Sequence, residues 1–428
     1  MNPEPTEIRN LMDAGDTAGA VRALRAHADS ADPAALAPLV AALAGRSGSG
    51  DLAAAATALA AAPSGVAELY AYGYACVEEG AAYLAVPALR AALRQVPDSR
   101  RVLVELVAAL EREERHREAL DVLRERESAL AAWPERYLLA HNALMAGESA
   151  LAREAAARLP VPVGDDQKWL PADTRLRRRL GRAGAVAGTT ALDGGDLRGW
   201  HWVLTGGVLA TLSPYGFESM RGRYAYVQDS AGLCRGGLDR LRLALAATGA
   251  APRAVAALPD RSSRIMGLAA ARVLELPVEP YEPGRMDTVV VAYDLTGTDP
   301  GLLDGLREPA AGQVLYEHAT CWTRPPAVSA DISGLLAQHC VAPWGERLRM
   351  SPDGSPGVVP PDDRSEHDIA HEVVAADPMP DRGDGGTPSD PDAGFSAFAA
   401  RLAGRWPDGD GLRERTASAG PVGSARFV

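Results

Sequence analysis

The first 160 residues repeat a spacing of small and apolar residues about every 34 positions, and this period limits the fold more than any other feature. Gly is followed by Ala five positions later and by Leu four positions after that. The spacing occurs at Gly15/Ala20/Leu24, Gly50/Ala55/Leu59 and Gly80/Ala85/Leu89, with weaker copies from Glu114 and Gly147. Gly can end a helix, Ala lets the next helix approach its neighbours, and Leu fills the gap one turn later. We therefore expect five stacked helix pairs.

The third unit carries a more specific pattern. Over residues 66–99 it places small, apolar and turn residues at spacings that resemble the tetratricopeptide repeat, namely Leu69, Gly73, Gly80, Ala85, Ala92 and Pro97. The resemblance is fair over residues 100–133 and elsewhere rests on the period. It implies an α-solenoid, a right-handed superhelix whose concave face, lined by the first helix of each pair, binds a peptide or a helix of a partner.

The outward positions of these first helices supply candidate groove residues. They are Tyr70, Tyr74, Arg101, Glu111 and Arg112. Aromatic and Arg side chains are common anchors of protein interfaces, so the two tyrosines are the first candidates. Two alternatives stay open. The tyrosines can pack against the next repeat, and the region can be an Ala-rich bundle without a ligand.

Residues 161–198 form a linker with an Arg-rich helix. "RLRRRLGR", Arg175 to Arg182, places five Arg in eight positions. A solvated helix face or a domain junction explains such a run most simply. A site for phosphate or for an acidic partner is the alternative, and the acidic tail of the same chain is one such partner.

Residues 199–350 alternate between strand and helix patterns, which indicates a mostly parallel α/β domain, Rossmann-like or phosphoribosyltransferase-like. We expect two short strands in "WHWVLTGGVLATLS" and further strands in "RYAYVQDS", "RAVAALP", "PVEPYE", "DTVVVAYD" and "QVLYEHATCW". Helices are expected in "AGLCRGGLDRLRLALAATG", "SSRIMGLAAARVLE" and "DPGLLDGLR". Such sheets bind ligands at the carboxyl ends of their strands.

Two strand ends supply candidate ligand-binding residues. After "RAVAALP" a helix begins near Ser262 and Ser263, where free backbone N–H groups attract phosphate, and Arg261 and Arg264 add positive charge. A Ser there is equally an ordinary helix cap. The stretch "DTVVVAYDLTGTD", an apolar strand that runs into acid, Thr and Gly, is the second such end.

Together these two strand ends resemble the core of the type I phosphoribosyltransferases over residues 253–307. The resemblance implies that Asp294, Thr296, Gly297 and Thr298 cradle a sugar phosphate. Two departures count against catalysis. Tyr293 stands where the family has a second acid, and only about a dozen residues separate Leu276 from Val289, too few for the long loop that shields the family's reaction. We therefore expect binding of a nucleotide or phosphorylated ligand, with an enzyme of this type as the alternative.

Residues 351–428 form an acidic tail rich in Pro and Gly. Between 351 and 394 eleven acids and two bases give −9 of the total charge of −12, so we expect mostly disordered chain there. The acidic balance argues against nucleic-acid binding. No apolar run is long enough to span a membrane and the first residues do not resemble a signal peptide, so a cytoplasmic location is expected.

The remaining motifs predict no catalytic residue, cofactor or metal site. His318, Cys321, His339 and Cys340 are residue types that bind zinc, but their spacing matches no common zinc motif. The sequence thus predicts an α-solenoid, residues 1–160, that binds a protein or peptide partner as a scaffold or regulator and is followed by the α/β domain.

Overall fold

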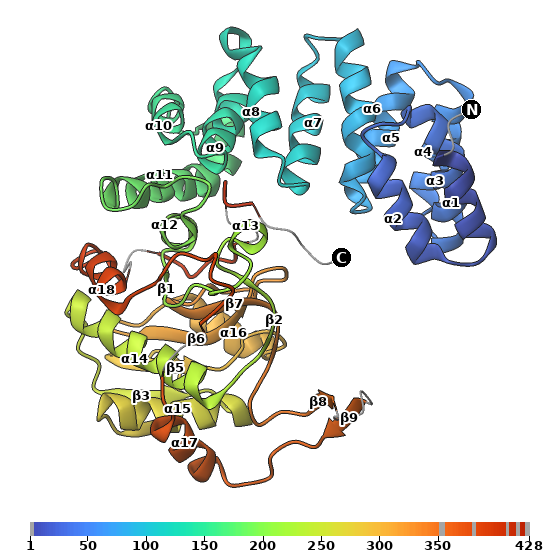
Figure 1. Ribbon diagram of the computed structural model, residues 1–428. Coiled ribbons are helices and arrows are strands. Elements are labelled where there is room, and N and C mark those ends of the chain that lie inside the picture. Colours follow the sequence, from blue (N-terminus) through green and yellow to red (C-terminus); the bar gives the residue numbers. More distant parts are fainter. Residues whose placement is uncertain (1–3, 351–355, 379–381, 408–410, 417–419, 424–428) are drawn as a thin grey trace. The chain divides into compact units, whose positions relative to one another are not determined.

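A computed structural model describes the chain except residues 1–3, 351–355, 379–381, 408–410, 417–419 and 424–428. The chain divides into two compact units, Met1–Arg177 and Arg178–Val428, and each is described by itself (Figure 1). No helix among the described residues combines the length and the apolar character that crossing a membrane requires.

The first unit is helical. Its helices are α1 (Glu4–Asp13), α2 (Thr17–His27), α3 (Pro33–Ser47), α4 (Gly50–Ala61), α5 (Val66–Glu78), α6 (Ala82–Gln95), α7 (Arg100–Arg112), α8 (His116–Arg124), α9 (Tyr137–Met145) and α10 (Ser149–Ala157). Three short segments are η1 (Glu127–Ala129), η2 (Ala132–Arg136) and η3 (Gly164–Trp169), and α11 (Leu170–Ala185) spans the boundary between the units.

Each odd-numbered helix from α1 to α9 is followed by one residue with a positive φ. These residues are Gly15, Gly48, Gly80, Glu114 and Gly147, with φ between 57° and 85°. Glu114 adopts this conformation although it has a side chain. After α5, the Ala81 N–H donates to Cys76 O at 2.8 Å and the Gly80 N–H donates to Val77 O at 3.2 Å, which satisfies the last carbonyls of the helix.

The second turn corrects one detail of the repeat. Gly48, and not Gly50, takes the left-handed conformation there, and Ala56, and not Ala55, is fully buried. The intervals between the five turn residues become 33, 32, 34 and 33, more regular than the spacing of the sequence motif. Small residues allow close contact between neighbouring helices. A Cβ on Gly73 of α5, for example, would lie 2.5 Å from Leu89 of α6.

The second unit contains a parallel sheet and the helices around it. The strands are β1 (Val208–Leu209), β2 (Tyr224–Gln228), β3 (Ala254–Ala257), β4 (Val278–Pro280), β5 (Thr288–Ala292), β6 (Val314–Cys321), β7 (Ile332–Val341), β8 (Arg347–Met350) and β9 (Pro356–Val359). The helices are α12 (Leu197–Thr205), α13 (Phe217–Met220), α14 (Ala231–Thr248), α15 (Arg261–Leu274), α16 (Pro300–Arg307), α17 (Glu366–Ala375) and α18 (Asp392–Ala400).

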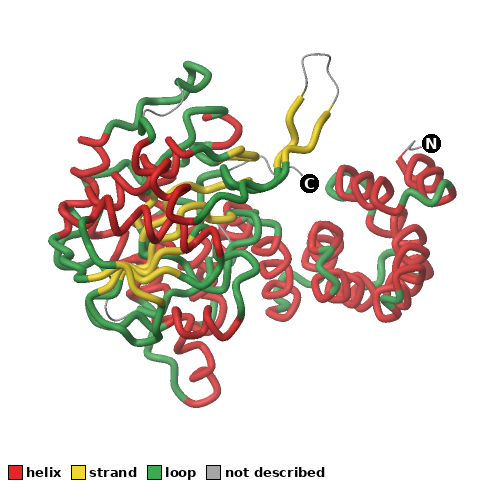
Figure 2. The backbone as a smooth tube through the Cα atoms, turned by 90° about the horizontal axis from the view of Figure 1, so that it is seen from below, coloured by secondary structure: helices red, strands yellow, loops and turns green. Residues whose placement is uncertain are grey.

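The sheet has the order β1-β7-β6-β5-β3-β4, with β2 also paired to β7, and every pairing is parallel. Figure 2 shows the strands side by side with helices around them. Helix α14 packs on β6 and β7, and α15 packs on β3 and β5. Leu306 of α16 joins a buried cluster with Val290, Ala292 and Leu315. The mostly parallel α/β fold is thereby confirmed.

Two predictions about this unit are wrong. The first half of "WHWVLTGGVLATLS" is helix α12 and not a strand, because Asp196 caps it through the Gly199 N–H and Gly206 ends it with a φ of 79°. The described part of residues 351–428 is not mostly disordered. It contains β9, α17 and α18, and it buries Ile369, Phe395 and Trp406. Few apolar side chains suffice there because α17 packs against α14 and α15, and α18 packs against α14.

Candidate functional site

The start of α15, where we predicted phosphate binding, is occupied by groups of the chain itself. Asp260 caps the helix by accepting from the Ser263 N–H at 2.9 Å. The buried Ser263 Oγ accepts from the Tyr293 N–H at 3.0 Å, and Ser262 Oγ accepts from Trp344 Nε1 at 2.9 Å. The two serines therefore connect the start of α15 to the residue after β5 and to the segment after β7.

The two arginines of this helix hold the C-terminal segment. Arg261 donates to the carbonyl oxygens of Asp362 and Arg364 at 2.7 and 3.0 Å. Arg264 forms an ion pair with Glu366 at 2.6 Å, at the first residue of α17. Carbonyl and carboxylate oxygens of the chain thus accept hydrogen bonds from the two guanidinium groups that we expected to bind a phosphate.

The loop after β5, predicted to cradle a sugar phosphate, is a compact turn. Asp294 Oδ1 accepts from the Thr296 N–H at 2.7 Å, and the Thr298 N–H donates to Leu295 O at 3.2 Å. Gly297 has a φ of 79°, and Thr296 and Gly297 are exposed. Burial raises the pKa of Asp294, and the charge of Asp260 adds to that rise. The structure therefore brings the two predicted strand ends close to each other.

A buried polar cluster at the same edge of the sheet was missed by the sequence analysis. Asp229 directly follows β2 and Tyr293 directly follows β5. The pairing of Ala292 with Glu317 sets Tyr293 beside His318 of β6. Asp229 Oδ2 lies 2.9 Å from His318 Nε2, accepts from the Tyr293 hydroxyl at 2.8 Å and accepts from Cys234 Sγ at 3.2 Å. The side chains of Asp229 and His318 are 0% and 1% exposed.

The environment of this cluster changes the acidity of its members. Burial alone would raise the pKa of Asp229, but His318 and the hydroxyl of Tyr293 lower it below its ordinary value. Burial raises the pKa of Cys234 well above its ordinary value, and the carboxylate of Asp229 adds to this rise. Burial also raises the pKa of Tyr293 well above its ordinary value, and the carboxylate of Asp229 adds to this rise. A carboxylate therefore lies among neutral thiol and hydroxyl groups.

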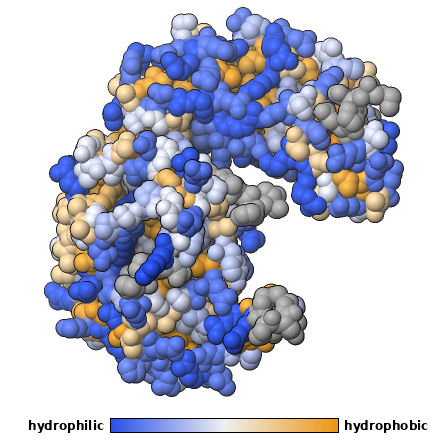
Figure 3. All heavy atoms as spheres, viewed as in Figure 1, coloured by the Kyte–Doolittle hydropathy of each residue, from blue (hydrophilic) through white to orange (hydrophobic). Residues whose placement is uncertain are grey.

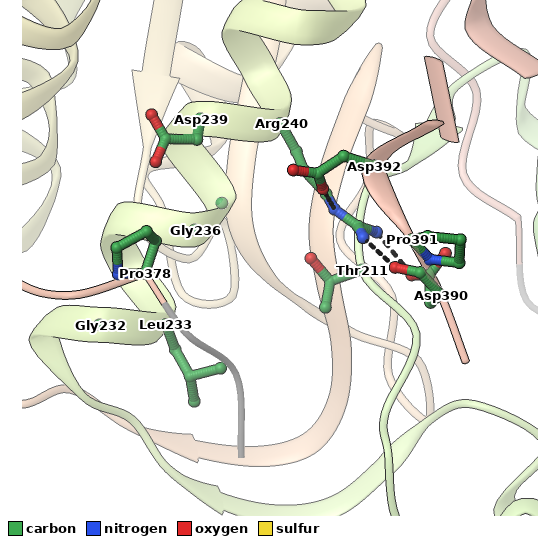
Figure 4. Close-up of a pocket in the computed structure, with 11 residues that line it drawn as sticks. Thr211, Gly232, Leu233, Gly236, Asp239, Arg240, Pro378, Asp390, Pro391 and Asp392 are labelled. Atoms are coloured by element: carbon green, nitrogen blue, oxygen red, sulfur yellow. Dashed lines mark hydrogen bonds and ion pairs between the residues drawn. The ribbon is translucent and has the colours of Figure 1, made fainter. Parts of the chain in front are cut away.

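A pocket of about 370 Å³ lies beside α14, between this helix, Thr211 and the C-terminal segment at Pro378 and 390–392. Figure 4 shows Arg240 of α14 reaching toward Asp390 and Asp392, which precede and begin α18. Arg240 Nη1 lies 2.5 Å from Asp390 Oδ2, and Arg198 binds both oxygens of Asp390 at 2.9 Å. The arginines that would attract an anion are thus paired with acids of the C-terminal segment.

The predicted groove residues of the first unit fall into two sets. Tyr70 and Tyr74 of α5 stack with ring centroids 6.3 Å apart, and the Arg101 guanidinium of α7 lies 4.4 Å from the Tyr70 ring. Tyr74 is 46% exposed. This array of Tyr70, Tyr74 and Arg101 connects α5 with α7 and leaves the ring of Tyr74 accessible.

Glu111 and Arg112 at the end of α7 are held by neighbouring helices. Glu111 Oε1 accepts from Asn142 Nδ2 at 2.6 Å and lies 4.0 Å from His141 Nε2 on α9. Burial raises the pKa of Glu111 to about 7, although the bond from Asn142 opposes the rise. Arg112 donates to Val77 O and lies 3.8 Å from Glu78 of α5. These two side chains connect successive odd-numbered helices.

The Arg-rich run at 175–182 forms part of α11. Arg177 pairs with Asp173 at 2.8 Å, and Arg182 lies 5.9 Å from the ring of Trp202. Acids of the C-terminal segment described above pair with Arg198, Arg240 and Arg264.

Comparison of the chain with models of protein families, with curated proteins and with solved structures gives no match.

Proposed function

We propose that the protein is a scaffold or regulatory protein whose first unit is a tetratricopeptide-like solenoid that binds an extended peptide segment of a partner. The five left-handed turns at intervals of 32 to 34 residues support the repeat. They follow each odd-numbered helix from α1 to α9 at an equivalent point, and we infer that these five helices line one face of the repeat.

The observation that carries the proposal is the array formed by Tyr74, Tyr70 and Arg101. Stacking and the cation–π contact hold the rings in place before any ligand arrives. A rigid aromatic side chain that is already ordered loses little entropy on binding, which is why such groups act as anchors. Tyr74 therefore offers a flat, accessible face to an apolar or proline side chain.

Charged side chains lie beside the array and can form hydrogen bonds with the backbone of a bound peptide. Glu78 continues the stripe of Tyr70 and Tyr74 along α5, and Arg112 of α7 lies beside it. Figure 3 shows that the visible face of the helical unit is mostly hydrophilic with smaller hydrophobic areas. A peptide with one apolar anchor between polar residues matches this pattern better than a long apolar helix does.

A site-specific crosslinking experiment tests the proposal. A photoreactive amino acid replaces Tyr74 in the full chain, and a second variant carries it at Val21, an exposed apolar position on the even-numbered helix α2. The captured protein is identified, and its binding to the wild type and to Tyr74→Ala is measured by calorimetry. We expect capture from position 74 alone and at least a tenfold loss of affinity in Tyr74→Ala, about 1.4 kcal/mol. Equal capture from both positions, or unchanged affinity, would contradict the proposal.

We do not propose the alternative of an enzyme acting on a nucleotide or sugar phosphate. Four side chains predicted to contact such a substrate already bind other groups of the chain. They are Arg261, Ser262, Ser263 and Arg264.

A further inference from the structure

Three side chains of types that bind metals converge in the core of the α/β unit from three separate parts of the chain. Asp229 follows β2, Cys234 lies in α14 and His318 lies in β6. One donor atom of each lies within 4.8 Å of the others, and all three residues are buried. Asp229 Oδ2 lies 2.9 Å from His318 Nε2 and 3.2 Å from Cys234 Sγ, and the sulfur lies 3.7 Å from the same nitrogen.

These distances suit a tetrahedral zinc ion. Zinc binds oxygen and nitrogen at about 2.0 Å and sulfur at about 2.3 Å, which places ligand atoms about 3.3–3.5 Å apart at tetrahedral angles. The three edges of the observed triangle differ from those values by only a few tenths of an ångström. The donor set of thiolate, imidazole and carboxylate favours zinc over magnesium or calcium, which prefer oxygen alone.

The groups around the triangle hold the ligands as metal sites require. His318 Nδ1 lies 3.1 Å from the Tyr316 hydroxyl, so the remaining ring nitrogen is oriented toward Asp229 and Cys234. The second oxygen of Asp229 accepts from the Ser230 N–H at 2.8 Å. Gly237 makes this packing possible, because a Cβ there would lie 2.6 Å from the Tyr316 hydroxyl.

Two further donor atoms lie beside the three. The Tyr293 hydroxyl is 2.8 Å from Asp229 Oδ2, and Cys340 Sγ is 3.4 Å from that hydroxyl. They supply candidates for the fourth position of a closed structural site. The charges also balance when the fourth ligand is a neutral hydroxyl such as that of Tyr293, because a divalent ion with one carboxylate, one thiolate and a neutral imidazole has no net charge, which a buried site requires.

We propose that Asp229, Cys234 and His318 bind a structural zinc ion that fastens β2, α14 and β6 together. The ligands are inaccessible to solvent, so the ion enters as the unit folds. Binding removes the proton of the Cys234 thiol, and the affinity therefore rises with pH.

Cobalt(II) is the direct probe, because a thiolate bound to cobalt gives a charge-transfer absorption in the near ultraviolet. The full chain is refolded without metal and titrated with Co²⁺ and then with Zn²⁺, and bound metal is also counted by mass spectrometry. We expect one equivalent per chain, a charge-transfer band that Zn²⁺ removes, and a higher Tm with Zn²⁺. A wild-type chain that folds without metal and shows no such band would overturn the proposal and leave a metal-free hydrogen-bonded cluster.

Cys234→Ser and Cys321→Ser form the matched pair of variants. Cys321 is a buried thiol of the same strand as His318, with Sγ 3.6 Å from Gln338 O. We expect Cys321→Ser to keep the band and the Tm shift and Cys234→Ser to lose both. A band that persists in Cys234→Ser would refute this ligand assignment.

Tyr316→Phe covers the case in which Cys234→Ser does not fold. It keeps all three ligands and removes only the hydroxyl on His318. We expect a roughly 10–100-fold weaker affinity for zinc with the charge-transfer band retained. An unchanged affinity would contradict the assigned role of His318.

Discussion

Glu317 is an acid whose chemistry is set by its position in β6. It is fully buried, with Oε1 accepting from the Leu295 N–H at 2.8 Å and Oε2 lying 2.5 Å from Thr320 Oγ1. Burial raises its pKa to about 8, although both hydrogen bonds oppose the rise. Thr320 Oγ1 also lies 3.1 Å from Ser333 Oγ, and a protonated Glu317 frees the single hydroxyl hydrogen of Thr320 for that serine.

The raised pKa predicts that stability falls as pH rises. Between pH 4.5 and 8 the unfolded chain releases the proton of Glu317 while the native state keeps it. The free energy of unfolding therefore decreases through this window, by at most about 1.4 kcal/mol per pH unit. Glu317→Gln stays neutral and keeps a donor toward Thr320, so we expect it to be more stable than the wild type at pH 8 and similar at pH 5.

Urea unfolding at both pH values measures this difference. Glu308→Gln, at an exposed acid after α16, is the control and should change neither value. A Glu317→Gln variant with the same pH dependence as the wild type would show that Glu317 is ionised in the native state.

Single residues also show where sequence reasoning reached its limit. Tyr70, Tyr74 and Arg101 were predicted from the spacing within helices, and the structure brings these three together. Asp229 and His318 were not paired in advance, because 89 positions separate them and only the register of β2, β7 and β6 makes them neighbours. The one local signal for Asp229 was its place near the end of a predicted strand, "RYAYVQDS".

At the scale of an element, α14 shows how small residues place a helix. Gly236 and Gly237 are adjacent, but only Gly237 faces the sheet. A Cβ on Gly237 would lie 2.6 Å from the Tyr316 hydroxyl and 3.1 Å from His318 Nδ1, whereas a Cβ on Gly236 would make an ordinary contact of 3.5 Å with Pro378 O. Gly237 thus sets how closely the helix approaches β6.

Alanine at these two positions gives opposite expected results. Gly237→Ala forces α14 away from β6, and we expect a loss of roughly 1–3 kcal/mol in the free energy of unfolding. Gly236→Ala gains helix propensity and should be neutral or stabilising by up to about 1 kcal/mol. Urea unfolding of both variants checks the difference. Equal effects would mean that α14 does not rest on Tyr316 as described.

At the scale of the molecule, the C-terminal residues complete the α/β unit. Arg413 is 4% exposed, pairs with Asp331 at 2.6 Å and donates to Leu306 O at 2.9 Å. Phe395, at the centre of α18, is fully buried, and Arg198 and Arg240 each lie 5.2 Å from its ring. Some of the acids that led us to predict disorder in this segment pair with arginines in the rest of the unit. Asp390 pairs with Arg198 and Arg240, for example.

Removal of residues 389–428 should therefore destabilise the second unit. Phe395 would be lost from the core, and Asp331 would be left without its cation, which by itself costs roughly 3–5 kcal/mol. We expect rapid proteolysis within residues 197–388 and protection of residues 4–177 as in the wild type. Arg413→Ala should reproduce part of the effect, whereas Arg307→Ala, at an exposed pair with Asp304, should change little. Unchanged proteolysis after the deletion would contradict this expectation and support the prediction of a disordered tail.

The sequence by itself determined the helix pairs of the first unit and most of the alternation of strands and helices in the second. Those features depend on spacings within about 35 residues, where turn glycines, helix caps and apolar periods act locally. Only the tertiary structure decided that the acidic tail folds, that α15 begins against protein groups, and that Asp229, Cys234 and His318 meet. Burial, strand register and charge pairing between distant segments determine these outcomes, and no local spacing encodes them.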